Sequence, residues 1–282
     1  MNVTFWGVRG STPCPCDRNR RYGGNTACVS LEVAGEDPIV LDLGTGLRFW
    51  GETLAQDGNF RATALLTHIH WDHVQGLPFF VPALQAGSHL DIYGPPDGGG
   101  TLEEAFDEFM RPPFFPVRVR DLLGEIRFHD VTDTDLSIGG AKVRVRPVPH
   151  TGATNGYRIE WDGATVAYIS DHQSPSGPDG EGHTIAEAVL ELCDGVDLLI
   201  HDTQYWAGEW AQKRDWGHCT VDYAVRVARE SGAHRLVLFH HDPAHDDAEV
   251  DRMLAHARAA AADCGIEEVI AAAEGLTISL DK

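Results

Sequence analysis

The feature that most constrains this chain is a dense cluster of histidines and one aspartate directly after a short apolar run. The run covers residues 62–66, and the cluster after it reads Thr67-His68-Ile69-His70-Trp71-Asp72-His73. Because side chains alternate along an extended strand, His68 and His70 can point the same way. Asp72 and His73 follow where the chain bends away. Imidazole and carboxylate groups bind Zn²⁺, Mn²⁺ or Fe, so the cluster predicts a site for two adjacent metal ions at a strand end.

The rest of the chain alternates short apolar runs, helical periodicities and turn residues. Strands are expected at 3–6, 29–33, 39–41, 62–66, 89–93, 126–129, 143–148, 157–161, 166–170, 198–200, 236–239 and 269–271, and helices at 47–55, 101–110, 184–192, 221–231 and 248–262. Many strands with interleaved helices fit an α/β fold of two packed sheets with helices outside. A dinucleotide fold is not expected, because no Gly-x-Gly-x-x-Gly follows the first strand. We expect one domain over residues 1–282.

Composition limits the partners and the location. The chain has 22 Lys and Arg against 43 Asp and Glu, a formal net charge of −21. Proteins that grip long nucleic acid usually present a basic face, so such partners are not expected. The longest apolar runs, such as 196–200, are far shorter than the roughly 20 residues of a membrane helix. With scattered cysteines and a start unlike a secretory signal, the sequence predicts a cytoplasmic protein with no membrane partner.

The His-x-His-x-Asp-His pattern after a strand resembles the signature of the metallo-β-lactamase-fold hydrolases, and later residues follow the order of that family. The resemblance implies a four-layer αββα sandwich with two divalent metal ions, zinc first, with manganese or iron as alternatives. The implied ligands are His68, His70 and His150 on one ion, Asp72, His73 and His240 on the other, and Asp171 as the bridge. His241 is the alternative to His240.

Two further segments, 198–203 and 217–220, resemble the phosphodiesterase branch of this family, which includes the tRNA 3′-processing endonuclease RNase Z. In that branch, a histidine matching His218 gives a proton to the leaving oxygen, and an acid matching Asp202 orients it. The candidate catalytic residues are therefore Asp72, His218 and Asp202. The resemblance implies that a hydroxide bridging the two ions is the nucleophile.

One departure from RNase Z narrows the substrate. That enzyme carries a long tRNA-gripping arm between its counterparts of His150 and Asp171, whereas only 20 residues lie between them here. That length suffices for a strand hairpin, so a small phosphodiester such as a cyclic nucleotide is favoured. The alternatives are a hydrolase of lactones, thioesters or other acyl substrates, or a metal-dependent sensor without catalysis. A homodimer is left open.

Other features of the sequence have less specific interpretations. The basic loop with Arg18–Arg21 can contact a phosphate and Tyr22 can stack on a base, but a solvated surface loop is the favoured interpretation. Cys14 and Cys16 are too few for a structural zinc site. The aromatic, proline-rich segment 111–116 favours packing in the core or at an interface over a place on a pocket rim. The histidines predicted at the surface are His89, His129, His183, His245 and His256.

Overall fold

The computed structural model describes residues 1–96, 98–175 and 184–280. One sheet contains β1 (Asn2–Gly7), β2 (Cys28–Glu32), β3 (Ile39–Leu41), β4 (Arg61–Leu65), β5 (His89–Gly94), β6 (Glu125–Asp130) and β14 (Thr277–Ser279). The other contains β7 (Thr134–Ile138), β8 (Ala141–Pro147), β9 (Asn155–Trp161), β10 (Ala164–Ile169), β11 (Leu198–Asp202), β12 (Arg235–Phe239) and β13 (Glu268–Ala271).

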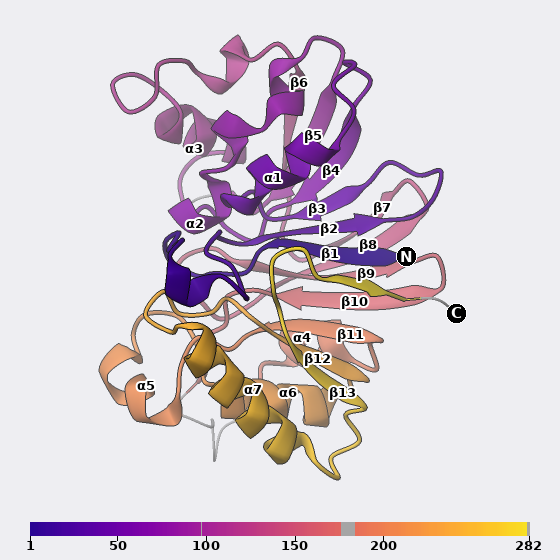
Figure 1. Cartoon of the computed structure of the whole chain (residues 1–282). Helices are drawn as coiled ribbons and strands as arrows, with labels where there is room; N and C mark the ends of the chain where they lie inside the picture. The colour runs from indigo at the N-terminus through magenta and orange to yellow at the C-terminus, as the bar shows by residue number, and fades with distance from the viewer. Residues whose placement is uncertain (97, 176–183, 281–282) are drawn as a thin grey trace.

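Helices cover the outer faces of both sheets (Figure 1). The helices beside the first sheet are α1 (Gly46–Thr53), α2 (Trp71–Val74) and α3 (Leu102–Phe109). Those beside the second are α4 (Glu187–Cys193), α5 (Ala207–Lys213), α6 (Val221–Ser231) and α7 (Asp247–Ala261). Short 3₁₀ turns occur at Asp17–Asn19, Leu77–Phe79, Val81–Leu84 and Val119–Asp121. This arrangement confirms the predicted four-layer αββα sandwich.

Each sheet is mixed in the same way. The first runs β14-β1-β2-β3-β4-β5-β6 and the second β13-β12-β11-β10-β9-β8-β7. Strands β3 to β6 are parallel, as are β10 to β13, and the remaining pairs are antiparallel. Because the carboxyl ends of parallel strands meet at one edge of a sheet, the loops after them gather there.

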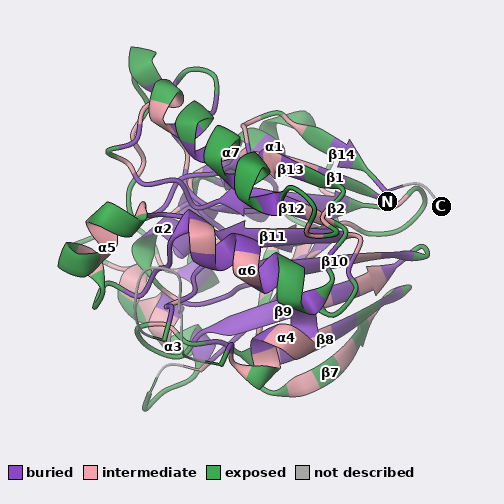
Figure 2. Cartoon of the chain, turned by 90° about the horizontal axis from the view of Figure 1, so that it is seen from below, coloured by how far each residue is buried: buried purple, intermediate pink, exposed green. Residues whose placement is uncertain are grey.

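Three apolar layers hold the four structural layers together. Between the sheets, Phe5 of β1 packs against Phe239 of β12, with ring centroids 6.1 Å apart. Under α1, the side chain of Trp50 stacks on Phe80. Under α6 and α7, side chains such as Met253 cover the second sheet, and Figure 2 shows β11 and β12 as buried beneath helices whose outer surfaces are exposed. Burial of these surfaces is the main stabilising contribution.

The longer helices begin and end where the local sequence predicts. Thr220 caps α6 by accepting a hydrogen bond from the Tyr223 backbone amide at 3.2 Å, and Gly232 ends that helix in a left-handed conformation. Asp246 caps α7 in the same way through the Glu249 amide at 3.0 Å. These side chains satisfy amides that would otherwise lack an acceptor.

The elements that the sequence did not predict are peripheral. They are β7 and β14 at sheet edges, the very short α2, and the exposed α5. Strand β7 is five residues long and alternates between exposed and half-buried positions, so it carries no continuous apolar run. The predicted helix at 184–192 begins later, at Glu187. In the described part of the chain, no helix has the length and hydropathy of a membrane span.

The inter-sheet contact yields a stability prediction. Replacing Phe5, which is fully buried, by Ala should lower the free energy of unfolding by about 3–5 kcal/mol, because it removes a ring and leaves a cavity. Equilibrium unfolding in urea measures the change. Leu123→Ala, at a side chain that is 69% exposed, is the control and should change stability by less than about 0.5 kcal/mol. Equal losses in the two variants would contradict this account of the core.

Candidate metal centre

The predicted metal ligands converge at one edge of the sandwich although they come from distant parts of the chain. His68, His70, Asp72 and His73 follow β4, His150 follows β8, Asp171 follows β10 and His240 follows β12. Strands of both sheets therefore contribute. Their potential ligand atoms fall into overlapping groups, each within 4.8 Å, that are suited to holding metal ions.

Three histidine nitrogens form the first group. Nε2 of His68 lies 2.8 Å from Nδ1 of His70, which lies 3.2 Å from Nε2 of His150. Oδ2 of Asp171 lies 3.8 Å from the His68 nitrogen and 3.6 Å from the His150 nitrogen. Four potential ligand atoms thus surround one point.

A second group lies on the other side of Asp171. Nε2 of His73 is 3.2 Å from Oδ2 of Asp72, and Nε2 of His240 is 3.1 Å from the same oxygen. Oδ1 of Asp171 lies 3.2 Å from the His73 nitrogen and 3.4 Å from the His240 nitrogen. The two oxygens of one carboxylate therefore face two different groups.

These separations fit metal ligation. With bonds of about 2.0–2.1 Å in a tetrahedral arrangement, neighbouring ligand atoms lie roughly 3.3–3.4 Å apart, within the range observed in both groups. Oδ1 of Asp171 is also buried without a well-aligned hydrogen-bond donor. A buried carboxylate oxygen normally has a partner, and a cation bound between His73 and His240 would provide one.

The electrostatics of the cluster fit the same interpretation. Burial alone would raise the pKa of Asp171, but the histidines around it, His240 and His73 first, hold it well below its usual range. For His68, burial lowers the pKa well below the ordinary value, and His73 adds to the effect. Asp171 is thus ionised and His68 neutral, which are the states that a divalent cation requires of its ligands. For His73 and His240, burial opposes protonation, but the carboxylates of Asp72 and Asp171 raise their pKa, so these two imidazoles would release a proton when a cation binds.

A buried aspartate that was not predicted from the sequence supports the ligand loop, the segment 67–73 that carries four of the candidate metal ligands. Oδ2 of Asp42 lies 2.8 Å from Nδ1 of His73 and accepts a hydrogen bond from the Tyr168 hydroxyl at 2.8 Å. Its Oδ1 accepts from the Thr67 amide at 2.7 Å. The signal was present, because Asp42 directly follows the strand at 39–41, but it lies 31 residues from His73, and only the parallel pairing of β3 with β4 brings the two together.

Other ligand candidates are held by neighbours in similar ways. Nδ1 of His240 lies 2.9 Å from Oε1 of Gln204, and Nδ1 of His150 donates to the Gly217 carbonyl at 2.6 Å. Gly217 has φ +89°, and a Cβ there would come within 2.4 Å of the His150 ring, so glycine is required. Fixing one ring nitrogen orients the other toward the centre.

His241, the alternative to His240, points elsewhere. Its Nε2 donates to the Ala272 carbonyl at 2.9 Å, and burial lowers its pKa to about 3. His240 is the neighbour that faces Asp72 and Asp171.

The two candidate catalytic residues form a pair beside this centre. Nδ1 of His218 donates to Oδ2 of Asp202 at 2.9 Å, and the same nitrogen lies 3.7 Å from Oδ2 of Asp171. Asp202 also accepts from the backbone amides of His172 at 3.0 Å and Gln204 at 2.9 Å. With Nδ1 committed to Asp202, the other nitrogen of His218 is left for another partner.

A pocket of about 730 Å³ lies over these residues. The pocket is lined by the candidate site residues His68, His70, Asp72, Asp171 and His218, and also by Ser11, Ile69, Trp71, Pro95, Pro96, Thr151, Gly152, Ala153, Asp215 and Trp216. This volume lies within the usual range for small-molecule sites.

The basic loop lies at the surface, as predicted, with Arg18 and Arg20 exposed, and its last two residues contact α7. Arg21 donates to the carboxylate of Asp251 at 3.1 Å and 2.5 Å, and the Tyr22 hydroxyl donates to the same group at 2.9 Å. Tyr22 is buried, so the idea that it stacks on a base is wrong. Within the described residues, neither Cys14 nor Cys16 belongs to a group that could hold a metal ion.

Two other expectations need correction. His245 is buried rather than at the surface, because its loop packs against α5, where its Nε2 lies 3.0 Å from Oε1 of Glu209. The segment 111–116 packs against the core only in part, since Phe115 contacts the apolar layer that contains Trp50 and Phe80 whereas Phe114 is 77% exposed. Of the other histidines, His256 is exposed, His89 and His129 are partly exposed, and His183 lies outside the described residues.

Comparison with known proteins agrees with this geometry. The model of the β-lactamase superfamily domain matches residues 52–241. Ribonuclease Z of Methanothermobacter thermautotrophicus is 25% identical over 85% of this chain and 86% of its own. The metallo-β-lactamase fold protein YhfI of Bacillus subtilis is 19% identical, with a TM-score of 0.73 over 98% of each chain. A diphosphatase of the PhnP family is 20% identical, with a TM-score of 0.69 over 99% of this chain and 98% of its own.

The family match covers more than half of the chain, and the fold and the cluster of histidines and aspartates agree with it. The chain belongs to the β-lactamase superfamily and has the metallo-β-lactamase fold. Within that superfamily it is a metal-dependent hydrolase, as the resemblance predicted.

The hydrogen bonds of Asp42 generate a prediction about metal affinity. Asp42→Asn should weaken zinc binding by about 10–100-fold, because an amide no longer accepts from Thr67, Tyr168 and His73 together. Competition with a chromophoric chelator measures the affinity. Asp91→Asn is the matched control, since Asp91 pairs with His129 at 2.7 Å outside the centre. Unchanged affinity in Asp42→Asn would show that the buried carboxylate does not orient His73.

Proposed function

We propose that the protein is a dinuclear metal-dependent phosphodiesterase that acts on small phosphodiesters such as cyclic nucleotides. His68, His70 and His150 would hold one divalent ion, Asp72, His73 and His240 the other, and Asp171 both, with zinc as the first choice. When bound, such ions neutralise phosphate charge and supply activated water. The chain's own groups must then orient the substrate and provide a proton.

One observation carries the proposal: the Asp202–His218 pair lies directly beside the bridging carboxylate. An alkoxide leaving from phosphorus needs a proton, and a histidine held by a carboxylate is suited to give it. The 2.9 Å contact fixes the Nδ1 proton on the Asp202 side, so a protonated His218 can donate from Nε2. Acyl hydrolysis on the same ions does not require this acid.

The topology supports a small substrate. Between His150 and Asp171, the chain forms only the antiparallel pair of β9 and β10, whose register runs from Trp161 opposite Ala164 to Tyr157 opposite Tyr168. No arm projects from this hairpin. The strong excess of acidic residues also disfavours a long polyanion.

Asp171→Ala provides the first test of the dinuclear arrangement. Because its two oxygens face the two groups, its removal should reduce bound metal from about two ions to well below one per chain. Metal content after gel filtration, by plasma mass spectrometry, measures this. Asp72→Ala, which alters the second group alone, should retain close to one ion. Equal metal content in Asp171→Ala and the unaltered protein would refute the bridging role.

His218→Ala tests the proton donor. Metal content should stay intact while kcat falls by about 10²–10⁴-fold. The loss should be smaller for bis(p-nitrophenyl) phosphate than for cyclic nucleotides, because p-nitrophenolate leaves without protonation. A merely structural role would slow both substrates equally. His256→Ala, which breaks an exposed contact to Asp222 of 2.6 Å, is the matched control and should leave kcat unchanged.

The activity itself is tested on bis(p-nitrophenyl) phosphate, on 2′,3′- and 3′,5′-cyclic nucleotides, and on a 3′-extended pre-tRNA. After loading with Zn²⁺ or Mn²⁺, we expect hydrolysis of the small diesters that a chelator abolishes, and little cleavage of the pre-tRNA. Hydrolysis of lactones or thioesters that survives His218→Ala, with no cleavage of phosphodiesters, would instead support an acyl hydrolase. Substrate binding without turnover would support a sensor.

A further inference from the structure

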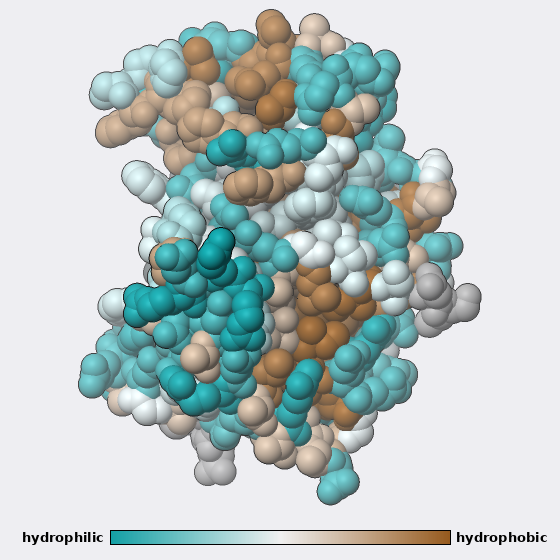
Figure 3. Space-filling model, viewed as in Figure 1, coloured by the Kyte–Doolittle hydropathy of each residue, from teal (hydrophilic) through white to brown (hydrophobic). Residues whose placement is uncertain are grey.

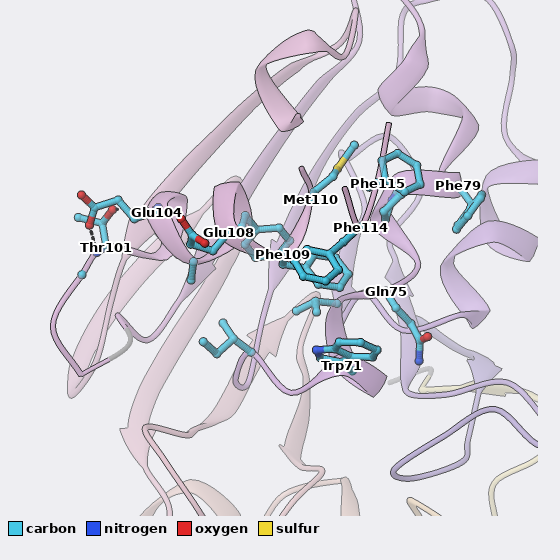
Figure 4. A pocket seen from close by; sticks show the side chains of 16 residues that line it. Trp71, Gln75, Phe79, Thr101, Glu104, Glu108, Phe109, Met110, Phe114 and Phe115 are labelled. Atoms are coloured by element: carbon cyan, nitrogen blue, oxygen red, sulfur yellow. Dashed lines mark hydrogen bonds between the residues drawn. The ribbon is translucent and has the colours of Figure 1, made fainter. Parts of the chain in front are cut away.

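A second cavity, of about 670 Å³, lies beside the metal pocket and is mostly apolar (Figure 4). It is bounded by the segment from Ile69 to Phe79 on one side and by α3 with the segment 110–116 on the other. The aromatic and sulfur side chains that line it are Trp71, Phe79, Phe106, Phe109, Met110, Phe114 and Phe115.

Several of these rings remain open to solvent despite their size. Trp71 is 72% exposed, Phe79 58% and Phe114 77%. Trp71 meets Phe109 edge-on at 6.4 Å, and Phe79 meets Phe115 edge-on at 5.8 Å, so the walls are preformed by ring contacts within the cavity. A concave cluster of exposed aromatic rings is typical of a binding site.

The cavity adjoins the metal pocket. Ile69 and Trp71 line both cavities, and they alternate in sequence with His70 and Asp72. A molecule whose phosphate lies over the metal centre can therefore pass a substituent over Trp71 into the apolar cavity without leaving the protein surface.

The charges around the cavity limit what can enter. Its polar end carries the carboxylates of Glu104 and Glu108, which Figure 4 shows on the side opposite to Phe115 and Phe79. The first accepts from the Thr101 amide at 2.8 Å and the second pairs with Arg111. No cationic side chain lines the cavity within the described residues, so a second phosphate would be disfavoured while an uncharged group would not.

We propose that this cavity binds an uncharged, apolar substituent of the phosphodiester whose phosphate lies at the metal centre. This inference rests on the proposed function and narrows its substrate class to phosphodiesters that carry one uncharged aromatic or aliphatic group beside the phosphate. Figure 3 shows hydrophobic residues among hydrophilic ones at the end of the molecule where Figure 1 places α3 and β6, and a further hydrophobic patch beside the mainly hydrophilic surface of α7.

The test compares methyl phosphate with hexyl phosphate, which share a headgroup and differ only in the alkyl chain. Calorimetric titration of the metal-loaded protein should give a Kd for hexyl phosphate at least about tenfold lower, because its chain leaves water for the cavity. Neither ligand needs to be hydrolysed, so this result is independent of turnover. Equal affinities would overturn the inference and leave the phosphodiesterase assays to decide the proposed function separately.

Variants of the aromatic residues test whether the hexyl chain binds in this cavity. Replacing the two exposed rings in the double variant Phe79→Ser and Phe114→Ser should reduce the preference for hexyl phosphate to about twofold or less. Phe49→Ser, at a ring that is 41% exposed on α1 and outside both pockets, is the control and should keep the full preference. Loss of the preference in the control, or its survival in the double variant, would place the alkyl chain elsewhere.

A neutral fluorophore gives a readout without metal or phosphate. N-phenyl-1-naphthylamine should bind the metal-free protein saturably, be displaced by hexyl phosphate from the metal-loaded protein, and fail to bind the double variant. Light scattering, which measures the oligomeric state, tests whether a second copy of this chain occupies the cavity instead. A dimer that Phe114→Ser converts to monomers would assign the aromatic cavity to a subunit interface and refute the inference.

Discussion

The arrangement of the site depends on one buried carboxylate, that of Asp171, placed where the loops of the two sheets meet. Its oxygens face histidines that come from three separate segments. Such groups can be buried without a large cost in free energy only if their charges are balanced. Carboxylates and imidazoles balance one another partly, and divalent cations would complete the balance. The same grouping that favours metal binding would destabilise the fold if its members lacked partners.

The sheets place this carboxylate through their topology. In each sheet the parallel strands direct their carboxyl ends to one edge, so residues after β3, β4, β10, β11 and β12 come together without any long connection. Asp42 then ties the first sheet to the second, because it accepts from Thr67 after β4 and from Tyr168 on β10. The hydrogen bonds of Asp42 therefore both join the two sheets and orient the loop that carries the candidate ligands.

Two adjacent pockets around this centre differ in polarity. Histidines and aspartates line the metal pocket, which would suit the phosphate of the proposed substrate once metal ions are bound, whereas the neighbouring cavity is mostly apolar and would suit an uncharged group. Trp71 stands between them and belongs to the ligand loop itself. Chemistry and substrate preference would thus be set by alternating residues of one short segment, with His218 and Asp202 supplying the proton from the other sheet.

The sequence by itself determined the sandwich of sheets and helices, the ligand-rich loop at 67–73 and the order of the later candidates, because apolar periodicity and dense local motifs are properties of neighbouring residues. Only the tertiary structure decided which of His240 and His241 faces the centre, since the two residues are adjacent and their side chains point to different partners, Asp72 and the Ala272 carbonyl. It also decided that Asp42 supports His73, that His245 is buried and that the aromatic segment at 111–116 borders an open cavity. Such contacts join residues far apart in the chain, and no local pattern specifies their register.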